Sequence, residues 1–384
     1  MSTTGAVSSR GDVNAAMSTE VWFAPGRANL MGEHTDYNEG FVLPFALAQG
    51  VTATASARDD GLLVLRSRQR PSESATLSLS SLAPRSVAGW AAYPAGAAWA
   101  LRAAGLDILG ASIDIDSDLP VGAGVSSSAA LECSVALALC SLSGLTVARG
   151  KLAKIAKRAE NEFVGAPTGI IDQSAALLCQ ADHAMLLDCR TLAAAQVPFQ
   201  PAAAGASALI VDTRVAHALV SGEYAARRAE CEEAARLLGV PALGLVTDPA
   251  EVERLADPVL RRRARHVVTD SIRAQAIAAA LQDAAPPDSY PLTGKLLTEG
   301  HASLRDDFEV SWPQADAAVD AAIEAGAYGA KMIGGGFGGS VLALIPAERV
   351  RSVREALAES FAARNWTPPE FLEAIPAPAA RRVA

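Results

Sequence analysis

The stretch Pro120-Val121-Gly122-Ala123-Gly124-Val125-Ser126-Ser127-Ser128-Ala129 separates two segments of different periodicity. Isoleucines alternate with polar residues over 112–118, which predicts a strand, and 128–142 is Ala/Leu-rich and long enough for a helix. Glycines let backbone N–H groups approach a ligand, and a helix N-terminus presents unpaired N–H groups to an anion. The stretch therefore fits a phosphate-binding turn as well as it fits a serine-capped helix after a tight turn.

The glycines here and near the C-terminus belong to neither common nucleotide fingerprint. No lysine follows Gly124, so the first cluster is not a Walker A loop. In 331–340, three glycines have the G-x-G-x-x-G spacing, but 341–345 reads as a strand where a dinucleotide fingerprint would open a helix. We expect a loop that a ligand or another backbone approaches closely.

The remaining periodicities predict an α+β or α/β protein in two lobes. Strands at 51–56 and 62–66 flank Asp59-Asp60-Gly61, which is a hairpin signal, and another strand is expected at 208–212. The Pro/Ala-rich segment 198–207 is the best linker between lobes at 20–200 and 208–374. Helices are expected at 151–163, 223–238, 271–284, 294–304, 314–325 and 347–364.

Length and charge limit the possible functions. The chain has 384 residues, which suggests about two domains at ~150 residues each. Its formal charge of −9 disfavours sequence-independent binding of nucleic acid, which requires a basic field. The basic run 261–265 is flanked by Asp257 and Asp270, so we expect a solvated helix face there.

Neither a membrane span nor a signal peptide is expected. The long uncharged runs, 119–131 and 133–148, fall short of the ~18 apolar residues that a spanning helix needs. Residues 1–19 have no apolar core and read as a disordered leader, and 375–384 read as a frayed tail. Five cysteines without metal-site spacing predict buried thiols and a cytoplasmic protein.

Two further segments are rich in polar residues. The first, 26–38, reads GRANLMGEHTDYN, and its carboxylates and arginine suit a polyhydroxylated ligand. A metal site at Glu33, His34 and Asp36 has less support, because no other His/Cys cluster supplies more ligands, and a solvated loop is the structural alternative. In the second, 165–173, Asp172 considered alone would be a helix cap.

Together, 26–38, 120–129 and 331–339 resemble the three motifs of the galactokinases, a family of the GHMP small-molecule kinase superfamily. The resemblance implies an α+β, two-lobed GHMP kinase fold, with a ribosomal-S5-like N-terminal lobe and a ferredoxin-like C-terminal lobe. It also implies ATP-dependent phosphorylation of galactose at the anomeric hydroxyl, giving α-D-galactose 1-phosphate and ADP. The active site would lie between the lobes of a monomer.

The same resemblance assigns roles to individual residues. Asp172 would be the catalytic base and Arg27 its partner, and an adjacent guanidinium would keep that carboxylate ionised. Matching positions suggest Glu33, His34, Asp36, Gly169 and Tyr224 for the sugar, and Ser128 and Glu160 for Mg²⁺. The ATP phosphates would be wrapped by Gly122, Ala123, Gly124, Val125, Ser126, Ser127 and Ser128.

Two alternatives remain beside this expectation. The first is a kinase for a related sugar such as N-acetylgalactosamine or arabinose. The second is a non-catalytic sugar sensor, which would be expected to show a damaged phosphate loop or to lack the base. Ser126-Ser127-Ser128-Ala129 and Asp172 are both intact, which argues against a sensor.

Overall fold

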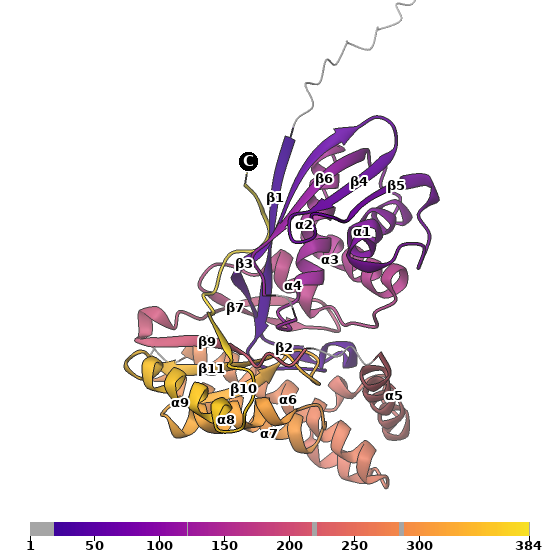
Figure 1. Cartoon of the computed structure of the whole chain (residues 1–384). Coiled ribbons are helices and arrows are strands. Elements are labelled where there is room, and N and C mark those ends of the chain that lie inside the picture. The colour runs from indigo at the N-terminus through magenta and orange to yellow at the C-terminus, as the bar shows by residue number, and fades with distance from the viewer. Residues whose placement is uncertain (1–18, 121, 217–220, 284–287, 384) are drawn as a thin grey trace, which may run out of the picture.

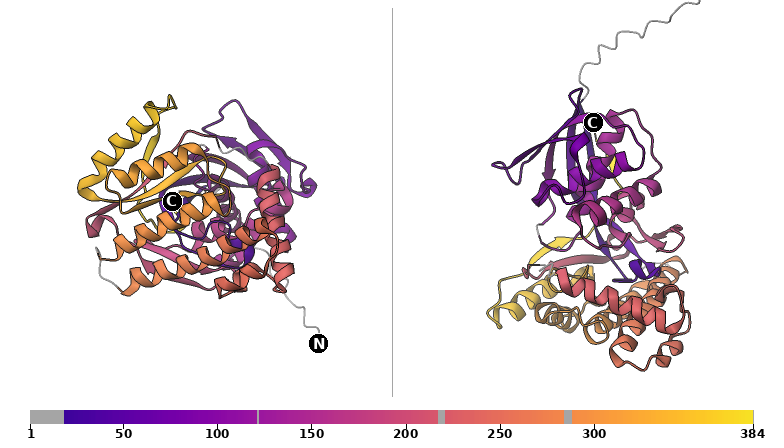
Figure 2. Two further views of the ribbon diagram at one scale, coloured as in Figure 1. Left: turned by 90° about the horizontal axis from the view of Figure 1, so that it is seen from below. Right: turned by 90° about the vertical axis from the view of Figure 1, so that its right-hand side faces the viewer.

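Two lobes make up the computed structural model, which describes residues 19–120, 122–216, 221–283 and 288–383. Figure 1 shows them one above the other, and the right-hand view of Figure 2 shows the same division from the side. The predicted leader, 1–19, lies outside the described residues except for Thr19, which begins the first strand. The boundaries 20–200 and 208–374 stay predictions.

The first lobe is built on a six-stranded sheet of order β13-β1-β3-β6-β4-β5. Its strands are β1 (Thr19–Asn29), β3 (Pro44–Arg58), β4 (Leu62–Ser67), β5 (Ser74–Ser78), β6 (Gly110–Ser117) and β13 (Arg381–Arg382). Helices gather on one side of this sheet, where α2 contacts β1 and β3 (Figure 1). They are α1 (Ala92–Ala103), α2 (Ser127–Leu142), α3 (Arg149–Arg158) and α4 (Ile171–Leu178).

The predicted hairpin between 51–56 and 62–66 is wrong. Both segments are strands, but β6 lies between them, antiparallel to β3 and parallel to β4. Alternation of apolar and polar residues identifies a strand without identifying its partner. Here β6 brings the buried side chains of Ile113 and Ile115 into the centre of the sheet, where the sheet gains most apolar burial.

The second lobe has a four-stranded antiparallel sheet of order β10-β11-β9-β12. In chain order this is 2-3-1-4, the strand order of the expected ferredoxin-like fold. The strands are β9 (Ala206–Asp212), β10 (Gly329–Ile333), β11 (Ser340–Pro346) and β12 (Glu370–Glu373). The helices are α5 (Ser221–Leu238), α6 (Pro258–Asp283), α7 (Ser289–Asp306), α8 (Pro313–Glu324) and α9 (Val350–Ala362).

A small three-stranded sheet and helix α6 connect the lobes. The sheet consists of β2 (Phe41–Val42), β7 (His183–Asp188) and β8 (Ala194–Pro198), and α6 contacts all three strands. One hydrophobic core contains Ile113 of the first lobe together with Ile277 of α6 and Leu342 of β11. The lobes therefore share buried apolar surface, which holds the segments between them in place.

The predicted frayed tail at 375–384 is wrong for the described residues. Val383 donates from its backbone N–H to the Val21 carbonyl at 2.7 Å, and Ala377 donates in the same way to Ala46 at 2.8 Å. The tail returns to the first lobe beside β1, where β13 pairs with that strand (Figure 1). Ala377 and Ala380 are buried, so composition alone misread a paired segment as a loose one.

Two other expectations can be compared with the structure. All five cysteines are buried and free, as the sequence predicted. The basic run 261–265 is not a wholly solvated face, because the Arg263 side chain is 3 % exposed and donates to Glu230 at 2.7 Å and to Glu309. Among the described residues, no helix is long and apolar enough to cross a membrane.

Candidate active site

The centre of the candidate site is an ion pair between Arg27, near the end of β1, and Asp172, in the first turn of α4. Arg27 Nε donates to Asp172 Oδ1 at 2.8 Å, and the two side chains are 9 % and 17 % exposed. Arg27 Nη1 also donates to the Gly124 carbonyl at 2.6 Å. The predicted base and its partner therefore meet beside the predicted phosphate loop.

The phosphate loop, 122–128, has the backbone expected of a glycine-rich turn. Gly122, Gly124 and Ser126 all have positive φ, near +82°, +70° and +61°. Such values are costly for Ser126, whose Oγ is buried and has no hydrogen-bond partner among the described residues. Helix α2 begins at the next residue, so the loop leads directly into a helix N-terminus, where an anion is stabilised.

A hydroxyl and a carboxylate face each other beside this loop. Ser128 Oγ donates to Glu160 Oε1 at 2.9 Å. The other oxygen of Glu160 accepts from Thr168 Oγ1 at 2.8 Å and from Gln173 Nε2 at 2.7 Å. Glu160 lies in a π-helical segment, Ala159–Val164, which follows α3 and replaces the regular helix predicted there.

The Ser128–Glu160 pair fits Mg²⁺ in its chemistry. Both are hard oxygen ligands, and Mg²⁺ usually binds one or two protein groups, several waters and the phosphates of its nucleotide. The described residues contain no group of three or more His, Cys, Asp or Glu side chains placed to hold a metal. Two ligands of this kind suit a cation that is delivered together with ATP.

The segment 32–41, which we call the sugar loop, carries Glu33, His34 and Asp36, all buried. Lys331 of β10 donates to Glu33 Oε2, and Gly334 N–H lies 3.4 Å from Oε1. His34 Nε2 lies 3.2 Å from the Gly335 carbonyl, so the second glycine cluster, 331–340, contacts the loop directly.

Two tyrosines pack around His34. Its Nδ1 lies 2.9 Å from Tyr37 Oη, and the rings of His34 and Tyr224 are 5.3 Å apart. Tyr224 belongs to α5, so a helix of the second lobe reaches the sugar loop. Burial raises the pKa of Tyr224 well above its usual value, which keeps the phenol protonated and able to donate a hydrogen bond.

Asp36 and Gly169 are in close contact. A Cβ atom at Gly169 would lie 1.6 Å from Asp36 Oδ2, so only glycine fits there. The same Asp36 oxygen accepts from the Ile171 N–H at 3.3 Å. Burial raises the pKa of Asp36, and the nearby Asp172 carboxylate raises it further.

Contacts therefore connect the predicted sugar, phosphate and base residues, but sequence reasoning missed several residues that support them. Gln173 and Thr168 hold Glu160, and Lys331 holds Glu33. His266 Nε2 lies 3.0 Å from the Glu33 carbonyl, and Asp270 Oδ2 accepts from the Gly32 N–H at 3.0 Å. Helical periodicity over 258–283 could have placed His266 and Asp270 on one face, but nothing in the sequence indicates their partners.

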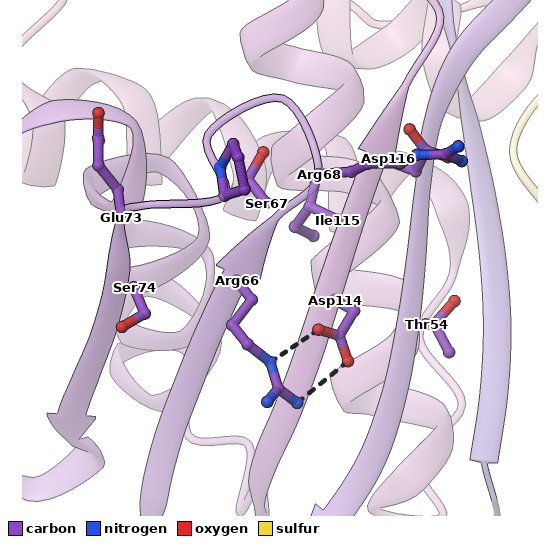
Figure 3. A pocket seen from close by; sticks show the side chains of 10 residues that line it. Thr54, Arg66, Ser67, Arg68, Glu73, Ser74, Asp114, Ile115 and Asp116 are labelled. Carbon is purple, nitrogen blue, oxygen red and sulfur yellow. Dashed lines mark hydrogen bonds and ion pairs between the residues drawn. The ribbon is translucent and has the colours of Figure 1, made fainter.

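A pocket of about 470 Å³ lies elsewhere, over β3, β4 and β6 (Figure 3). Its walls carry exposed ion pairs such as Arg66–Asp114, with Nε to Oδ1 at 2.8 Å. None of the predicted site residues lines it. Exposed ion pairs of this kind contribute little to the stability of the fold, and we assign the pocket no role.

The lobes, the glycine loop that opens a helix and the Arg–Asp pair define a small-molecule kinase of the GHMP class. The model for the GHMP kinase N-terminal domain matches 92–180, and that for the GHMP kinase C-terminal domain matches 274–363. The galactokinase galactose-binding signature matches 13–57, which contains the sugar loop.

Comparison with individual proteins shows to which family of GHMP kinases the chain belongs. The chain is 49 % identical to a galactokinase of Streptomyces coelicolor, over 94 % of each chain. It is 44 % identical to one of Mycobacterium tuberculosis, over 93 % of this chain and 97 % of the relative. The crystal structure of Lactococcus lactis galactokinase complexed with galactose matches with a TM-score of 0.90 at 32 % identity. The match covers 97 % of this chain and 96 % of that one. The chain belongs to the galactokinase family.

Proposed function

We propose that this protein transfers the γ-phosphoryl group of ATP to the anomeric hydroxyl of D-galactose, giving α-D-galactose 1-phosphate and ADP. The observation that carries the proposal is the Arg27–Asp172 pair, which joins the phosphate loop through Gly124 and lies next to the Asp36–Gly169 contact. The residues expected to bind the phosphoryl donor and those expected to bind the sugar acceptor therefore both lie beside the Asp172 carboxylate. We further propose that the enzyme is a cytoplasmic monomer with no nucleic-acid or membrane partner.

In this mechanism Asp172 orients the anomeric hydroxyl and accepts its proton. A bond forms between the anomeric oxygen and the γ-phosphorus, and the bond from that phosphorus to the β–γ bridging oxygen breaks. Arg27 holds the Asp172 carboxylate in place and stabilises the negative charge on the transferring group. Because such transfers are largely loose, orientation by Asp172 contributes alongside proton removal.

The phosphate loop binds the leaving diphosphate through its backbone N–H groups and the α2 N-terminus. Ser128 and Glu160 would hold Mg²⁺, which supplies charge neutralisation at the phosphates. Thr168 and Gln173 keep one oxygen of Glu160 engaged, so that the other points toward Ser128.

On the acceptor side, Glu33, His34, Asp36 and Tyr224 would bind sugar hydroxyls, with backbone contact from Gly169. A site that hydrogen-bonds the axial hydroxyl of galactose should reject glucose by on the order of 10⁴, because buried polar groups would be left unpaired.

The test is an ADP-release assay with Mg²⁺-ATP and galactose, N-acetylgalactosamine, arabinose or glucose as acceptor. We expect galactose to be preferred and glucose to be nearly inert. A folded protein that shows no turnover with galactose would contradict the proposal, and faster turnover with another of these sugars would reassign the substrate.

A further inference from the structure

Lys331 is a fully buried lysine that neither the phosphate loop nor the Arg27–Asp172 pair requires. Its side chain is 0 % exposed and lies on β10, in the second lobe. The ammonium donates to Glu33 Oε2 and, at 3.0 Å, to the Met332 carbonyl. It therefore connects the second lobe to the sugar loop.

A buried ion pair is a costly way to join two lobes. Removing both charges from water offsets much of their attraction, and two apolar side chains of similar volume commonly stabilise a protein as well or better. Burial also raises the pKa of Glu33, and the Lys331 ammonium acts in the opposite direction. The pair makes physical sense where an ionised carboxylate is needed at a fixed place.

The hydrogen bonds that Glu33 accepts use only part of the accepting capacity of its carboxylate. A carboxylate has about four lone-pair sites, and Lys331 and the Gly334 N–H approach one oxygen each. The side chain is 3 % exposed, so few groups can reach the remaining sites. A hydroxyl that reaches Glu33 would meet an acceptor that is already oriented.

We propose that Lys331 is a positioning residue for sugar recognition, which fixes the ionised Glu33 so that it accepts one particular hydroxyl of the sugar. This inference rests on the proposed function, because it takes Glu33 to be a sugar-binding residue. Lys331 itself does not touch the sugar and acts through Glu33 alone.

The experiment measures equilibrium dissociation constants by calorimetry for galactose and its 2-, 3-, 4- and 6-deoxy analogues. Lys331→Met keeps the apolar stem and removes the ammonium. We expect galactose to bind about 10- to 100-fold more weakly, the usual cost of losing a charged hydrogen bond. The KM for ATP should stay within about twofold of wild type, unlike the KM for galactose. Lys295→Met removes a lysine whose side chain is 72 % exposed and serves as the matched control.

The dissociation constant of one deoxy analogue should not change in Lys331→Met, because that analogue lacks the hydroxyl that donates a hydrogen bond to Glu33. The same analogue should be insensitive to Glu33→Gln. Equal loss for every sugar, deoxy analogues included, would overturn the inference.

A double variant covers the case in which Lys331→Met does not fold. Lys331→Met combined with Glu33→Gln leaves no unpaired buried charge. If Lys331 acts through Glu33, this variant should bind galactose within about twofold of Glu33→Gln alone. A further tenfold loss would overturn the inference. Wild-type protein that binds galactose without phosphorylating it would refute the proposed activity and leave this test intact, whereas absence of binding would overturn both.

Discussion

The sugar loop and the phosphate loop are held in different ways. Side chains from the second lobe anchor the sugar loop, since Asp270 and His266 bond to its backbone and Lys331 to Glu33. Within the loop, Thr35 Oγ1 lies 2.8 Å from the carbonyls of both Gly32 and Phe41. Its shape is fixed by specific polar contacts.

The phosphate loop is instead held by its carbonyl oxygens. Arg27 donates to Gly124 O, and Ser340 Oγ donates to Ala123 O at 2.7 Å. The Arg27 backbone N–H donates to Val125 O at 3.1 Å. Anchoring the carbonyls suits a loop whose N–H groups are to bind phosphate.

This difference indicates how each side of the site recognises its substrate. The sugar side is preorganised by buried side chains, so small changes there should affect the affinity for galactose. The phosphate side depends on backbone conformation and on Mg²⁺, so changes there should affect the nucleotide. Substitutions on each side of the site can test that division.

The largest effect is expected at the junction of the two sides. Asp172→Asn keeps the shape of the side chain but removes the proton acceptor, so kcat should fall by about 10²- to 10⁴-fold. Galactose binding, measured by calorimetry, should remain detectable. Near-normal turnover would show that another group is the base.

On the sugar side, Gly169→Ala should act selectively. The added Cβ would lie 1.6 Å from Asp36 Oδ2 and must displace that carboxylate. Overpacking costs about 1–3 kcal/mol, so the KM for galactose should rise by about 10- to 100-fold while the KM for ATP changes little. Gly150→Ala, where a Cβ meets nothing within 4 Å, is the matched control. An equal rise in both KM values would argue against separate sides.

On the phosphate side, Gln173→Leu removes a hydrogen bond to Glu160 at 2.7 Å and a longer one to the buried Glu132 at 3.3 Å. Groups that orient a metal ligand commonly contribute 10- to 100-fold in affinity, so the Mg²⁺ concentration for half-maximal activity should rise about tenfold. Titration of the ADP-bound protein with Mn²⁺, followed by electron paramagnetic resonance, gives an independent readout. Gln196→Leu in β8 is the control. An unchanged Mn²⁺ affinity would remove Gln173 from the metal site.

The smallest effect concerns His266, one of the residues that anchor the sugar loop, and the pH dependence of the free energy of unfolding. Burial lowers the pKa of His266 below 6.5, so below about pH 6.5 the unfolded chain binds a proton that the folded state does not. This histidine therefore costs stability as the pH falls, by at most about 1.4 kcal/mol per pH unit.

Urea unfolding at pH 7.5 and 5.5 checks that sign. His266→Asn should lose less stability on acidification than wild type. The pKa of buried Glu160 is raised, which has the opposite effect on stability, but it is present in both proteins and cancels in the comparison. His183→Asn, in β7, should behave as wild type. A larger acid loss in His266→Asn would contradict the assignment of a neutral buried ring.

Much of the architecture could be predicted from local patterns. The helix after the serines and the strands around the second glycine cluster lie where periodicity and turn residues placed them. The expectation of a cap at Asp172 is wrong, because the helix begins at Ile171 and Asp172 lies inside its first turn. These features depend on neighbouring residues, which a sequence shows directly. The same holds for the five buried cysteines.

Features that depend on distant partners could not be predicted. The hairpin prediction is wrong because strand pairing is decided by the whole sheet. The prediction of a solvated Arg263 is wrong because its partners, Glu230 and Glu309, lie 33 and 46 residues away in the sequence. For the site, the resemblance named the residues expected to touch substrates. It assigned no role to Lys331, Gln173 or His266. The contacts of Lys331 and His266 with Glu33 exist only once the lobes have packed together, and that of Gln173 with Glu160 depends on how α4 packs within the first lobe.

The return of the tail to β1 has a consequence for how the protein is made. β1 leaves the ribosome long before β13, its partner at that edge, which emerges after the whole four-stranded sheet. The first sheet therefore cannot complete its outer edge during most of synthesis. Until then β1 presents unpaired backbone groups to other nascent chains, and its final strand arrives only when the second lobe can already fold.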